Sequence, residues 1–430
     1  MIDPAELKYI YQNQQSEPEK LSLLADFLVR VSRFGRGTQA FKVMYFEKIL
    51  NFIRVLSLYI VSKNDFMVSL SGENFSAGKP ESRITSSFID LLYNLNILLY
   101  KNDKLLFNKK YDTFIDNDKN LLISLFEEDF DQASRLSNIV VDFLFIRDLI
   151  NKYRNNQNEP GAMKKSGSRW EQMIEDGRLN YEIRLAETLY ELSRLRIPHK
   201  IEAPFDEDYY TESGRNAFKN FTQYKFIDIF TEMVKKRDEA NIIDIGCGYG
   251  NYIDVLNANY PMFHITGIET QKKVYEETYR KFGQTDNIDI IHGDFFKHKF
   301  ERKFDIILVN YVLFYFNRKE KVALLKKAKE LLSENGSIIV CQYFSGIERL
   351  KKELALKQNE WSRYKEIEMF YSNKILYANT LWNDAADTFS ESVKWNEFLE
   401  VIIENDLKIN GITNADKFYY SFFIELTPKK

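Results

Sequence analysis

Asn241-Ile-Ile-Asp-Ile-Gly-Cys-Gly-Tyr-Gly-Asn251 is the stretch on which the organisation of this chain depends. Ile242, Ile243 and Ile245 form an apolar run of the kind found in buried parallel strands. The alternating glycines that follow predict a tight turn, because glycine tolerates positive φ and leaves room for a ligand near the backbone. A helix beginning at Asn251 would direct its free N–H groups toward that turn. The stretch therefore predicts the first strand, turn and helix of a doubly wound sheet.

The glycine spacing separates this turn from a dinucleotide-binding turn. Gly246, Gly248 and Gly250 give G-x-G-x-G, whereas dinucleotide folds use G-x-G-x-x-G. Asp244 stands two residues before the first glycine, where a carboxylate repels a pyrophosphate but accepts hydrogen bonds from an ammonium group. Together these residues resemble the first motif of class I S-adenosylmethionine-dependent methyltransferases. The resemblance implies that the turn, including Cys247, binds the methionine half of the cofactor.

The following segments continue the pattern of a Rossmann-like α/β sheet. Four more apolar runs are predicted as strands, at residues 264–268, 288–292, 304–309 and 336–341. Glu269 closes the second strand, where an acid is expected to meet a ribose. The resemblance implies that Asp294 binds the adenine amine, that Phe295 packs on the adenine ring, and that Asn310 completes the cofactor site. It also implies a seven-stranded sheet whose last strand is antiparallel.

Length and composition limit the other possibilities. The 430 residues predict two or three domains. A net charge of −3 argues against a nucleic-acid partner, and the lysine pairs 326–327 and 351–352 are expected to lie on solvated helix faces. Two cysteines, no signal-like start and no bilayer-length apolar run predict a cytoplasmic protein without a membrane partner. The four histidines form no ligand cluster, so no metal site is predicted.

Residues 1–150 are predicted to form a mainly helical domain. Residues 86–99 place Phe88 and several leucines on one helical face, and residues 100–108 follow as a hairpin. A helix with a short β wing resembles the winged-helix dimerisation domain of small-molecule O-methyltransferases, which implies a homodimer. DNA binding is the alternative for such a unit, but the helix has no Arg or Lys and carries Asp90.

The remaining chain is divided into a connection and a catalytic region. Residues 151–200 are expected to form a linker and a bridging helix, and residues 201–430 the methyltransferase domain. In many members of the family the segment that matches residues 205–215 folds over the cofactor, which makes Tyr210 a weak catalytic candidate. An ordinary surface loop is the alternative. The resemblance implies that residues 345–370 cover the acceptor, and residues 375–382 are expected to line its pocket.

Methyl transfer from a sulfonium is an in-line displacement, for which the protein supplies alignment and desolvation. An O–H or carbon-acid acceptor also needs a base. Plant-type O-methyltransferases use a histidine after the fourth strand, but Phe314 occupies that position here. Tyr311 and Tyr315 are weak catalytic candidates, with packing or substrate contact as the alternative. The N-P-P-Y-type motif of nucleic-acid base methylation is absent after Val309.

The predicted function is methyl transfer from S-adenosylmethionine to oxygen or activated carbon of a small molecule in secondary metabolism, with S-adenosylhomocysteine as the product. Two alternatives stay open. One is a peptide or protein methyltransferase that docks its substrate on the helical half. The other is a non-catalytic cofactor-binding or transcriptional module. The presence of all the acidic residues of the predicted cofactor site argues against this alternative.

Overall fold

The computed structural model describes residues 38–64, 66, 82–101, 104–111, 126, 138–158, 180–204, 223–234, 238–416 and 418–429. The chain divides into two compact units. The first comprises Met1–Ala203 and Ser362–Asp387, and the second Pro204–Trp361 and Thr388–Lys430. The expected segment 205–215 with Tyr210, the linker between residues 159 and 179, and the hairpin turn at 102–103 lie outside the described residues.

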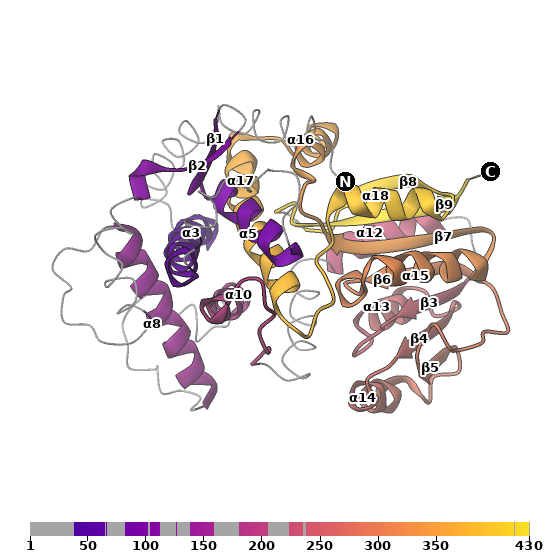
Figure 1. The fold of residues 1–430 in the computed structure, drawn as a ribbon. Helices are drawn as coiled ribbons and strands as arrows, with labels where there is room; N and C mark the ends of the chain where they lie inside the picture. Colours follow the sequence, from indigo (N-terminus) through magenta and orange to yellow (C-terminus); the bar gives the residue numbers. More distant parts are fainter. Residues whose placement is uncertain are drawn as a thin grey trace. The chain divides into compact units, whose positions relative to one another are not determined.

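The second unit is built on one seven-stranded sheet with the order β5-β4-β3-β6-β7-β9-β8 (Figure 1). Its strands are β3 Asn241–Ile245, β4 His264–Glu269, β5 Ile288–His292, β6 Phe304–Asn310, β7 Leu332–Tyr343, β8 Leu407–Asn414 and β9 Ser421–Pro428. Strands β3 to β7 pair in parallel, and β9 pairs antiparallel with both β7 and β8. The predicted Rossmann-like sheet with an antiparallel last strand is confirmed.

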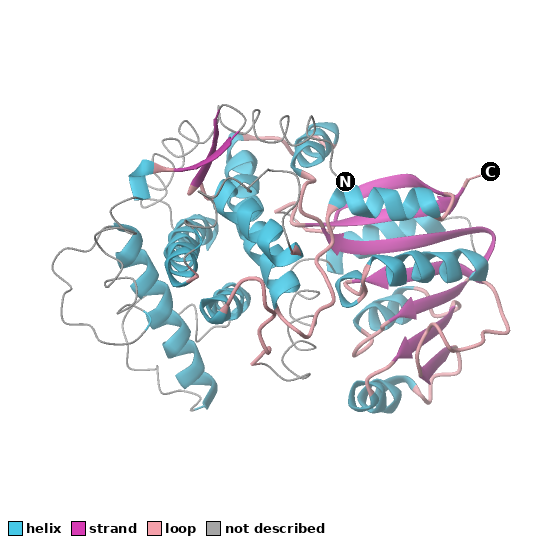
Figure 2. Ribbon diagram, in the orientation of Figure 1, coloured by secondary structure: helices cyan, strands magenta, loops and turns pink. Residues whose placement is uncertain are grey.

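Three helices lie between successive parallel strands (Figure 2): α13 Asn251–Asn259, α14 Lys272–Phe282 and α15 Arg318–Leu331. Helix α12 Gln223–Val234 precedes β3, the 3-10 turn η5 Leu313–Tyr315 precedes α15, and α16 Glu348–Lys357 and α18 Trp395–Glu404 follow β7. Local sequence sets where α15 begins. The Asn317 side chain accepts from the Glu320 N–H, and the Glu320 carboxylate accepts from the Asn317 N–H. This capping box fixes the chain direction at the end of the loop after β6.

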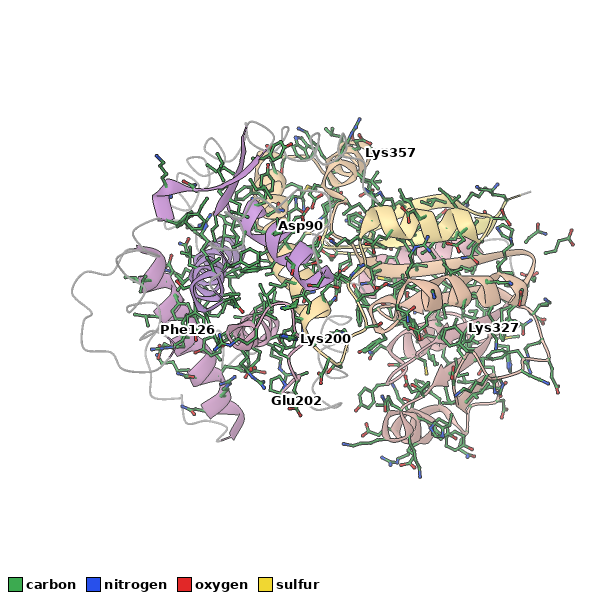
Figure 3. The ribbon with its side chains drawn as sticks, viewed as in Figure 1. Asp90, Phe126, Lys200, Glu202, Lys327 and Lys357 are labelled. Atoms are coloured by element: carbon green, nitrogen blue, oxygen red, sulfur yellow. The ribbon has the colours of Figure 1, made fainter. Side chains whose placement is uncertain are left out.

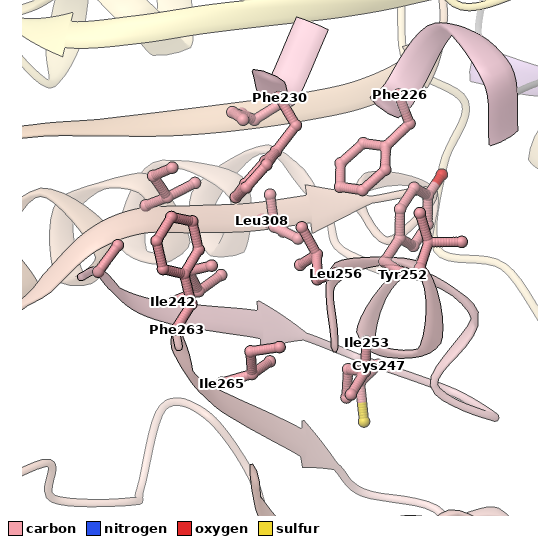
Figure 4. Packing of buried hydrophobic residues seen from close by; sticks show 14 of the residues in the cluster. Phe226, Phe230, Ile242, Cys247, Tyr252, Ile253, Leu256, Phe263, Ile265 and Leu308 are labelled. Carbon is pink, nitrogen blue, oxygen red and sulfur yellow. The ribbon is translucent and has the colours of Figure 1, made fainter. Parts of the chain in front are cut away.

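An apolar core joins α12 and α13 to the sheet (Figure 4). Phe226 and Phe230 of α12 are at most 1% exposed. They belong to the same buried cluster as Leu256 of α13, Ile242 of β3 and Leu308 of β6. Each fully buried side chain of this size contributes roughly 1.5–3 kcal/mol to folding. The carboxyl ends of β3 and β6 are therefore held by a packed core immediately beneath them.

The first unit is mainly helical. Its elements are α3 Thr38–Lys63, α5 Arg83–Asn94, β1 Leu98–Lys101, β2 Lys104–Phe107, η1 Lys109–Tyr111, α8 Asn138–Asn158, α10 Asn180–Tyr190, η3 Glu191–Arg194 and α17 Arg363–Ala385. The expected helix and the hairpin that follows it are present as α5 and the antiparallel pair β1–β2. Their assignment to a winged-helix dimerisation domain stays a prediction.

Helix α17 packs with the first unit, although the sequence pattern assigned its residues to the methyltransferase region 201–430. It lies against α5 and α3. The buried Asp384 carboxylate accepts from Arg83 Nε at 2.9 Å and from the Ser87 hydroxyl, and Lys374 Nζ donates to the Asn94 carbonyl. An apolar helical face shows that a segment is buried but does not show against which core. The sequence pattern therefore did not indicate which helices α17 packs against.

The expectation that two lysine pairs are solvated is wrong for one member of each pair. Lys327 of α15 is half-buried, and Lys351 of α16 is 1% exposed. Burial lowers the pKa of Lys351 to about 8, while Glu348 and Asp416 raise it. The neighbouring Lys326 and Lys352 project from a different side of the same helices. A count of charged residues does not distinguish the buried from the exposed side of a helix. Among the helices that the structure describes, none has the length and apolar character needed to cross a membrane.

Candidate active site

Three glycines with positive φ form the turn after β3. The angles are 66° at Gly246, 53° at Gly248 and 71° at Gly250. Other residues enter this left-handed region at a cost of roughly 1–2 kcal/mol. A Cβ on Gly250 would lie 2.5 Å from Phe282 Cε2, and one on Gly246 would lie 3.1 Å from Val312 Cγ2. A Cβ on Gly248 would meet nothing within 4 Å, so the turn is open there to a ligand.

Backbone hydrogen bonds tie this turn to the end of β4. The N–H groups of Gly246 and Cys247 both donate to the Ile268 carbonyl, at 2.9 and 3.2 Å. The Gly250 N–H donates to the Cys247 carbonyl at 2.9 Å and closes the turn. Because these bonds use only main-chain atoms, the shape of the turn depends on which residues tolerate its φ angles. This explains why the glycine spacing is informative in the sequence.

Glu269, the last residue of β4, connects the turn with the loop that follows β4. Its Oε2 accepts from the Gly248 N–H at 3.0 Å, and its Oε1 accepts from the Gln271 N–H at 2.8 Å. The side chain is 8% exposed, so these two donors fix its orientation. Each carboxylate oxygen retains a second lone pair. Glu269 can therefore accept from a further donor while it holds the turn.

Asp244 carries an unsatisfied carboxylate oxygen beneath the turn. The residue is 1% exposed, and its Oδ2 has no hydrogen-bond partner among the described residues. Burial, with a smaller contribution from the nearby Glu269, raises its pKa to about 8. A buried polar atom without a partner costs roughly 1–3 kcal/mol. A cationic ligand would remove that cost, so Asp244 fits the ammonium group of S-adenosylmethionine.

Asn310 ends β6 on the same face of the sheet as Asp244. The register pairs Asp244 with Leu308, and Asn310 follows Leu308 by two residues, so the side chains share a face. Asn310 is 8% exposed, and within the described chain neither its Oδ1 nor its Nδ2 has a hydrogen-bond partner. A primary amide both donates and accepts. Two adjacent strands therefore present unsatisfied polar groups at one edge, which fits a zwitterionic ligand.

Both cysteines are buried thiols rather than nucleophiles. Burial, together with Asp244 and Glu269, raises the pKa of Cys247 well above its ordinary value. Burial also raises the pKa of Cys341 on β7. The thiolate is the reactive form of cysteine, and it is disfavoured at both positions. Cys247 therefore contributes packing and backbone geometry to the turn.

The turn after β5 contains the residues expected at the adenine. Asp294 Oδ1 accepts from the Phe296 N–H at 2.8 Å, and Asp294 Oδ2 lies 3.5 Å from Lys297 Nζ. Phe295 is 5% exposed, and its ring centroid lies 5.7 Å from that of Phe300. The ring is thus directed into a packed aromatic group. Stacking of Phe295 on an adenine ring stays a prediction.

The carboxyl ends of β6 and β7 carry aromatic rings. We call Phe314, Tyr315, Tyr343, Phe389 and Tyr420 the aromatic cluster. Phe314 is central, because its ring centroid lies 4.8 Å from Tyr315, 5.2 Å from Phe389 and 5.8 Å from Tyr343. Tyr343 lies 5.5 Å from Tyr420. The position that would hold a histidine base is therefore occupied by the packed ring of Phe314. The cluster contains no imidazole or carboxylate.

The tyrosine candidates for catalysis differ in environment. Tyr311 has a φ of 53°, and burial raises its pKa well above the ordinary value, with Cys341 and Tyr252 raising it further. Such a phenol stays protonated and is a poor general base. Tyr315 is 43% exposed and belongs to the aromatic cluster. Tyr210 lies outside the described residues.

Three members of the aromatic cluster were not predicted from sequence. Tyr343 ends β7, Phe389 precedes α18, and Tyr420 precedes β9. Their only signal is an aromatic residue near a strand or helix end. Such a signal has little weight in a chain whose aromatic content is 15%.

Comparison with known proteins agrees with this geometry. Residues 242–336 match the family model described as a methyltransferase domain, over the stretch that forms the glycine turn and β3 to β6. This match and the glycine turn identify residues 242–336 as a methyltransferase domain of the class I S-adenosylmethionine-dependent type. The cofactor of this methyltransferase domain is S-adenosylmethionine, with S-adenosylhomocysteine as the product.

Similar proteins include two plant enzymes and one solved structure. The methyltransferase domain is 28% identical to (S)-coclaurine N-methyltransferase of Thalictrum flavum subsp. glaucum over 117 residues, which is 26% of this chain and 32% of the relative. N-methyltransferase 4 of Papaver somniferum is 23% identical over 195 residues, 44% of this chain and 54% of the relative. The chain thus spans between a third and about half of these relatives.

The solved structure is the O-methyltransferase family 2 protein from Planctomyces limnophilus in complex with apigenin. It superposes with a TM-score of 0.53 at 14% identity and covers 90% of this chain and 95% of that protein. At this identity the likeness concerns the fold. It extends beyond the residues that the family model matches.

Proposed function

We propose that the protein transfers a methyl group from S-adenosylmethionine to a small-molecule acceptor. The observation that carries the proposal is the unsatisfied Asp244 carboxylate beneath a glycine turn that is open at Gly248. When bound, the cofactor supplies a methyl group on a positively charged sulfur. In this proposal Asp244 and Asn310 hold the methionine end, Glu269 orients the ribose, and Asp294 accepts from the adenine amine.

The acceptor is proposed to bind beside the aromatic cluster. Because Phe314 replaces a histidine and Tyr311 stays protonated, the reaction would depend on alignment and on exclusion of water. Acceptors that are already nucleophilic suit such a site: an acidic hydroxyl, an activated carbon or a neutral amine. The first two follow from the sequence. The amine has support from similarity to (S)-coclaurine N-methyltransferase. The structure in complex with apigenin gives comparable support to a phenolic hydroxyl.

The wider setting is part of the same proposal. We place the reaction in secondary metabolism and in the cytoplasm, and we expect the helical residues 1–150 to form a homodimer. The residues 151–200 are expected to connect them to the methyltransferase domain. Light scattering of the full chain tests the dimer, and a monomer mass would contradict it.

Titration calorimetry with S-adenosylhomocysteine tests the cofactor site. Wild type is expected to bind at about micromolar Kd. Asp244→Ala should lower the affinity by roughly a hundredfold, because the buried ammonium loses its charged partner. Asp254→Ala is the matched control, since Asp254 is an exposed acid on α13 that pairs with Lys281 at 3.1 Å. Wild-type affinity in Asp244→Ala would exclude the assigned site.

Transfer of a labelled methyl group to a panel of phenols, amines and keto acids then tests the activity. Methylated small molecules are the expected products. Transfer to peptides alone would favour a peptide or protein methyltransferase. Binding of S-adenosylhomocysteine without transfer to any acceptor would favour the non-catalytic module.

A further inference from the structure

Lys327 of α15 donates to three backbone carbonyls of the turn that follows β5. Its Nζ lies 2.6 Å from the Phe295 carbonyl, 3.0 Å from that of Phe296 and 2.7 Å from that of His298. A lysine ammonium has three N–H donors and no acceptor. Every donor of Lys327 is therefore used on one short segment of chain, residues 294–298, which we call the adenine turn.

The same side chain also contacts the aromatic rings beneath the adenine turn. Lys327 Nζ lies 5.1 Å from the ring centroid of Phe295 and 5.7 Å from that of Phe300. A cation at this distance over a ring face is attracted by the electron-rich face of the ring. Lys327 thus binds both the backbone of the turn and the ring of Phe295. Burial lowers the pKa of Lys327, and Asp294 and Glu330 raise it.

The adenine turn has few constraints of its own. Within it, the N–H groups of Lys297 and His298 both donate to the Asp294 carbonyl, at 3.0 and 2.9 Å, and the Phe296 N–H donates to the Asp294 side chain. These bonds form a single turn without a helix or strand. Lys327 donates to three carbonyls of this turn, so the lysine links the turn to helix α15.

Lys327 is one of the side chains of helix α15 (Figure 3). The first turn of α15 is fixed by the capping box of Asn317 and Glu320. Leu324, Leu325 and Ala328, which flank Lys327 along the helix, are fully buried. A displacement of the Lys327 backbone would require movement of this packed helix. The adenine turn therefore takes its position from α15 as well as from β5.

We propose that Lys327 is a positioning residue that holds the adenine turn in the conformation in which Asp294 faces the amine of the cofactor base. The inference rests on the proposed cofactor site. It adds that selectivity for an amino-purine depends on a lysine that does not touch the cofactor. The carboxylate of Asp294 keeps its direction toward a ligand only if the backbone of the adenine turn is fixed. The three charge-assisted hydrogen bonds from Lys327 fix that backbone.

The test compares two ligands by titration calorimetry. One is S-adenosylhomocysteine, and the other is S-inosylhomocysteine, in which a carbonyl oxygen replaces the adenine amine. Wild type is expected to prefer the adenine compound by about tenfold or more, since one hydrogen bond to a charged acceptor is lost in the other. Lys327→Met keeps the length of the side chain and removes the three donors. Its preference is expected to fall to about twofold, with weaker binding of S-adenosylhomocysteine.

Lys329→Met is the matched control. Lys329 lies on the same helix and donates to the carbonyl of Asn405 at 2.8 Å, away from the adenine turn. This variant should lose some stability but retain the ligand preference of wild type. A Lys327→Met protein that binds more weakly yet keeps the full preference would overturn the inference, because the lysine would then only stabilise the fold.

Two further outcomes are distinguishable. If Lys327→Met fails to fold by circular dichroism, Lys327→Arg serves instead, because a planar guanidinium keeps the charge but cannot place its donors on the same three carbonyls. An undiminished preference in Lys327→Arg would also overturn the inference. Absence of S-adenosylhomocysteine binding to wild type would overturn the proposed cofactor site itself, and the role of Lys327 with it.

Discussion

Two groups of loops at the carboxyl ends of the parallel strands, which we call edges, are stabilised by different interactions. The cofactor edge, formed by the turns after β3, β4 and β5, depends on main-chain hydrogen bonds and on acids that accept from backbone N–H groups. The edge at which we propose the acceptor binds, formed after β6 and β7 and before β9 and called the acceptor edge below, depends on packed rings. Few residue types satisfy the first kind of geometry, whereas many satisfy the second.

Alanine substitution of one glycine at each edge is expected to give the largest difference in unfolding free energy between the two edges. Gly250 at the cofactor edge and Gly346 at the acceptor edge have φ angles of 71° and 84°. A Cβ on Gly250 would lie 2.5 Å from Phe282, while one on Gly346 would meet nothing within 4 Å. Gly346→Ala is expected to lower the free energy of unfolding by about 1 kcal/mol, and Gly250→Ala by about 2–4 kcal/mol. Denaturant unfolding measures both, and equal losses would remove the proposed distinction.

A change of pH separates the edges through Asp244. Its folded pKa of about 8 exceeds the ordinary value of 3.8, so the folded chain holds this proton more tightly than the unfolded chain. The stabilising effect is complete below about pH 4 and is lost as the pH rises through about 8. Each unit of pKa shift corresponds to about 1.4 kcal/mol, which gives an effect of a few kcal/mol.

Asp244→Asn should therefore stabilise the ligand-free protein at about pH 8, with little difference at about pH 4, where the wild-type carboxyl is also neutral. Melting temperatures of both proteins across this range measure the effect. Wild-type and Asp244→Asn curves that run parallel across the range would show that the residue is already ionised in the folded protein. Binding of S-adenosylhomocysteine at about pH 7 should release a proton, which calorimetry in buffers of different ionisation enthalpy detects.

Phe314→Leu tests whether the acceptor edge is separable from the cofactor edge. The substitution removes ring contacts with Tyr315, Tyr343 and Phe389, and should cost about 1–3 kcal/mol in unfolding free energy. Affinity for S-adenosylhomocysteine should stay within about twofold of wild type, since these ring contacts of Phe314 lie with residues after β6, at the end of β7 and before α18. A larger loss of affinity would show that the two edges are coupled.

Asn317→Ala gives the smallest expected effect. Loss of the side-chain cap at the start of α15 should cost about 1 kcal/mol, measured by thermal melting. Asn317→Ser is the control, because serine accepts from the same backbone N–H and should retain most of the stability. Identical melting of both variants and wild type would mean that the loop after β6 is fixed without the cap.

How far the sequence predicted each edge follows from the same difference. The turn residues Gly246 to Gly250, with Asp244 and Glu269, were predictable because their geometry is imposed within a few residues of chain. The aromatic cluster draws Phe389 and Tyr420 from segments far from Phe314, and no local pattern encodes such proximity. Lys327 was misjudged for a related reason: its partners are backbone carbonyls, which leave no trace in residue type.

The sheet was predicted strand by strand, but the division of the chain was not. Buried strands carry apolar runs bounded by turns, so their number and order could be read locally. Helix α17 has an equally apolar face, yet its partners are Ser87 and Arg83, nearly three hundred residues earlier in the chain. Contacts at such separation are decided by three-dimensional packing, which a single sequence does not display.

The placement of α17 bears on how the chain emerges from the ribosome. All five parallel strands are synthesised before α17, and β8 and β9 follow it. Until α17 appears, α5 lacks the carboxylate of Asp384, and the Asn94 carbonyl lacks the Lys374 ammonium. The helical unit therefore cannot complete its packing until α17, which lies far downstream in the sequence, has been synthesised. Translation pauses before residue 362 should prolong a state in which an incomplete helical unit is open to chaperones and proteases.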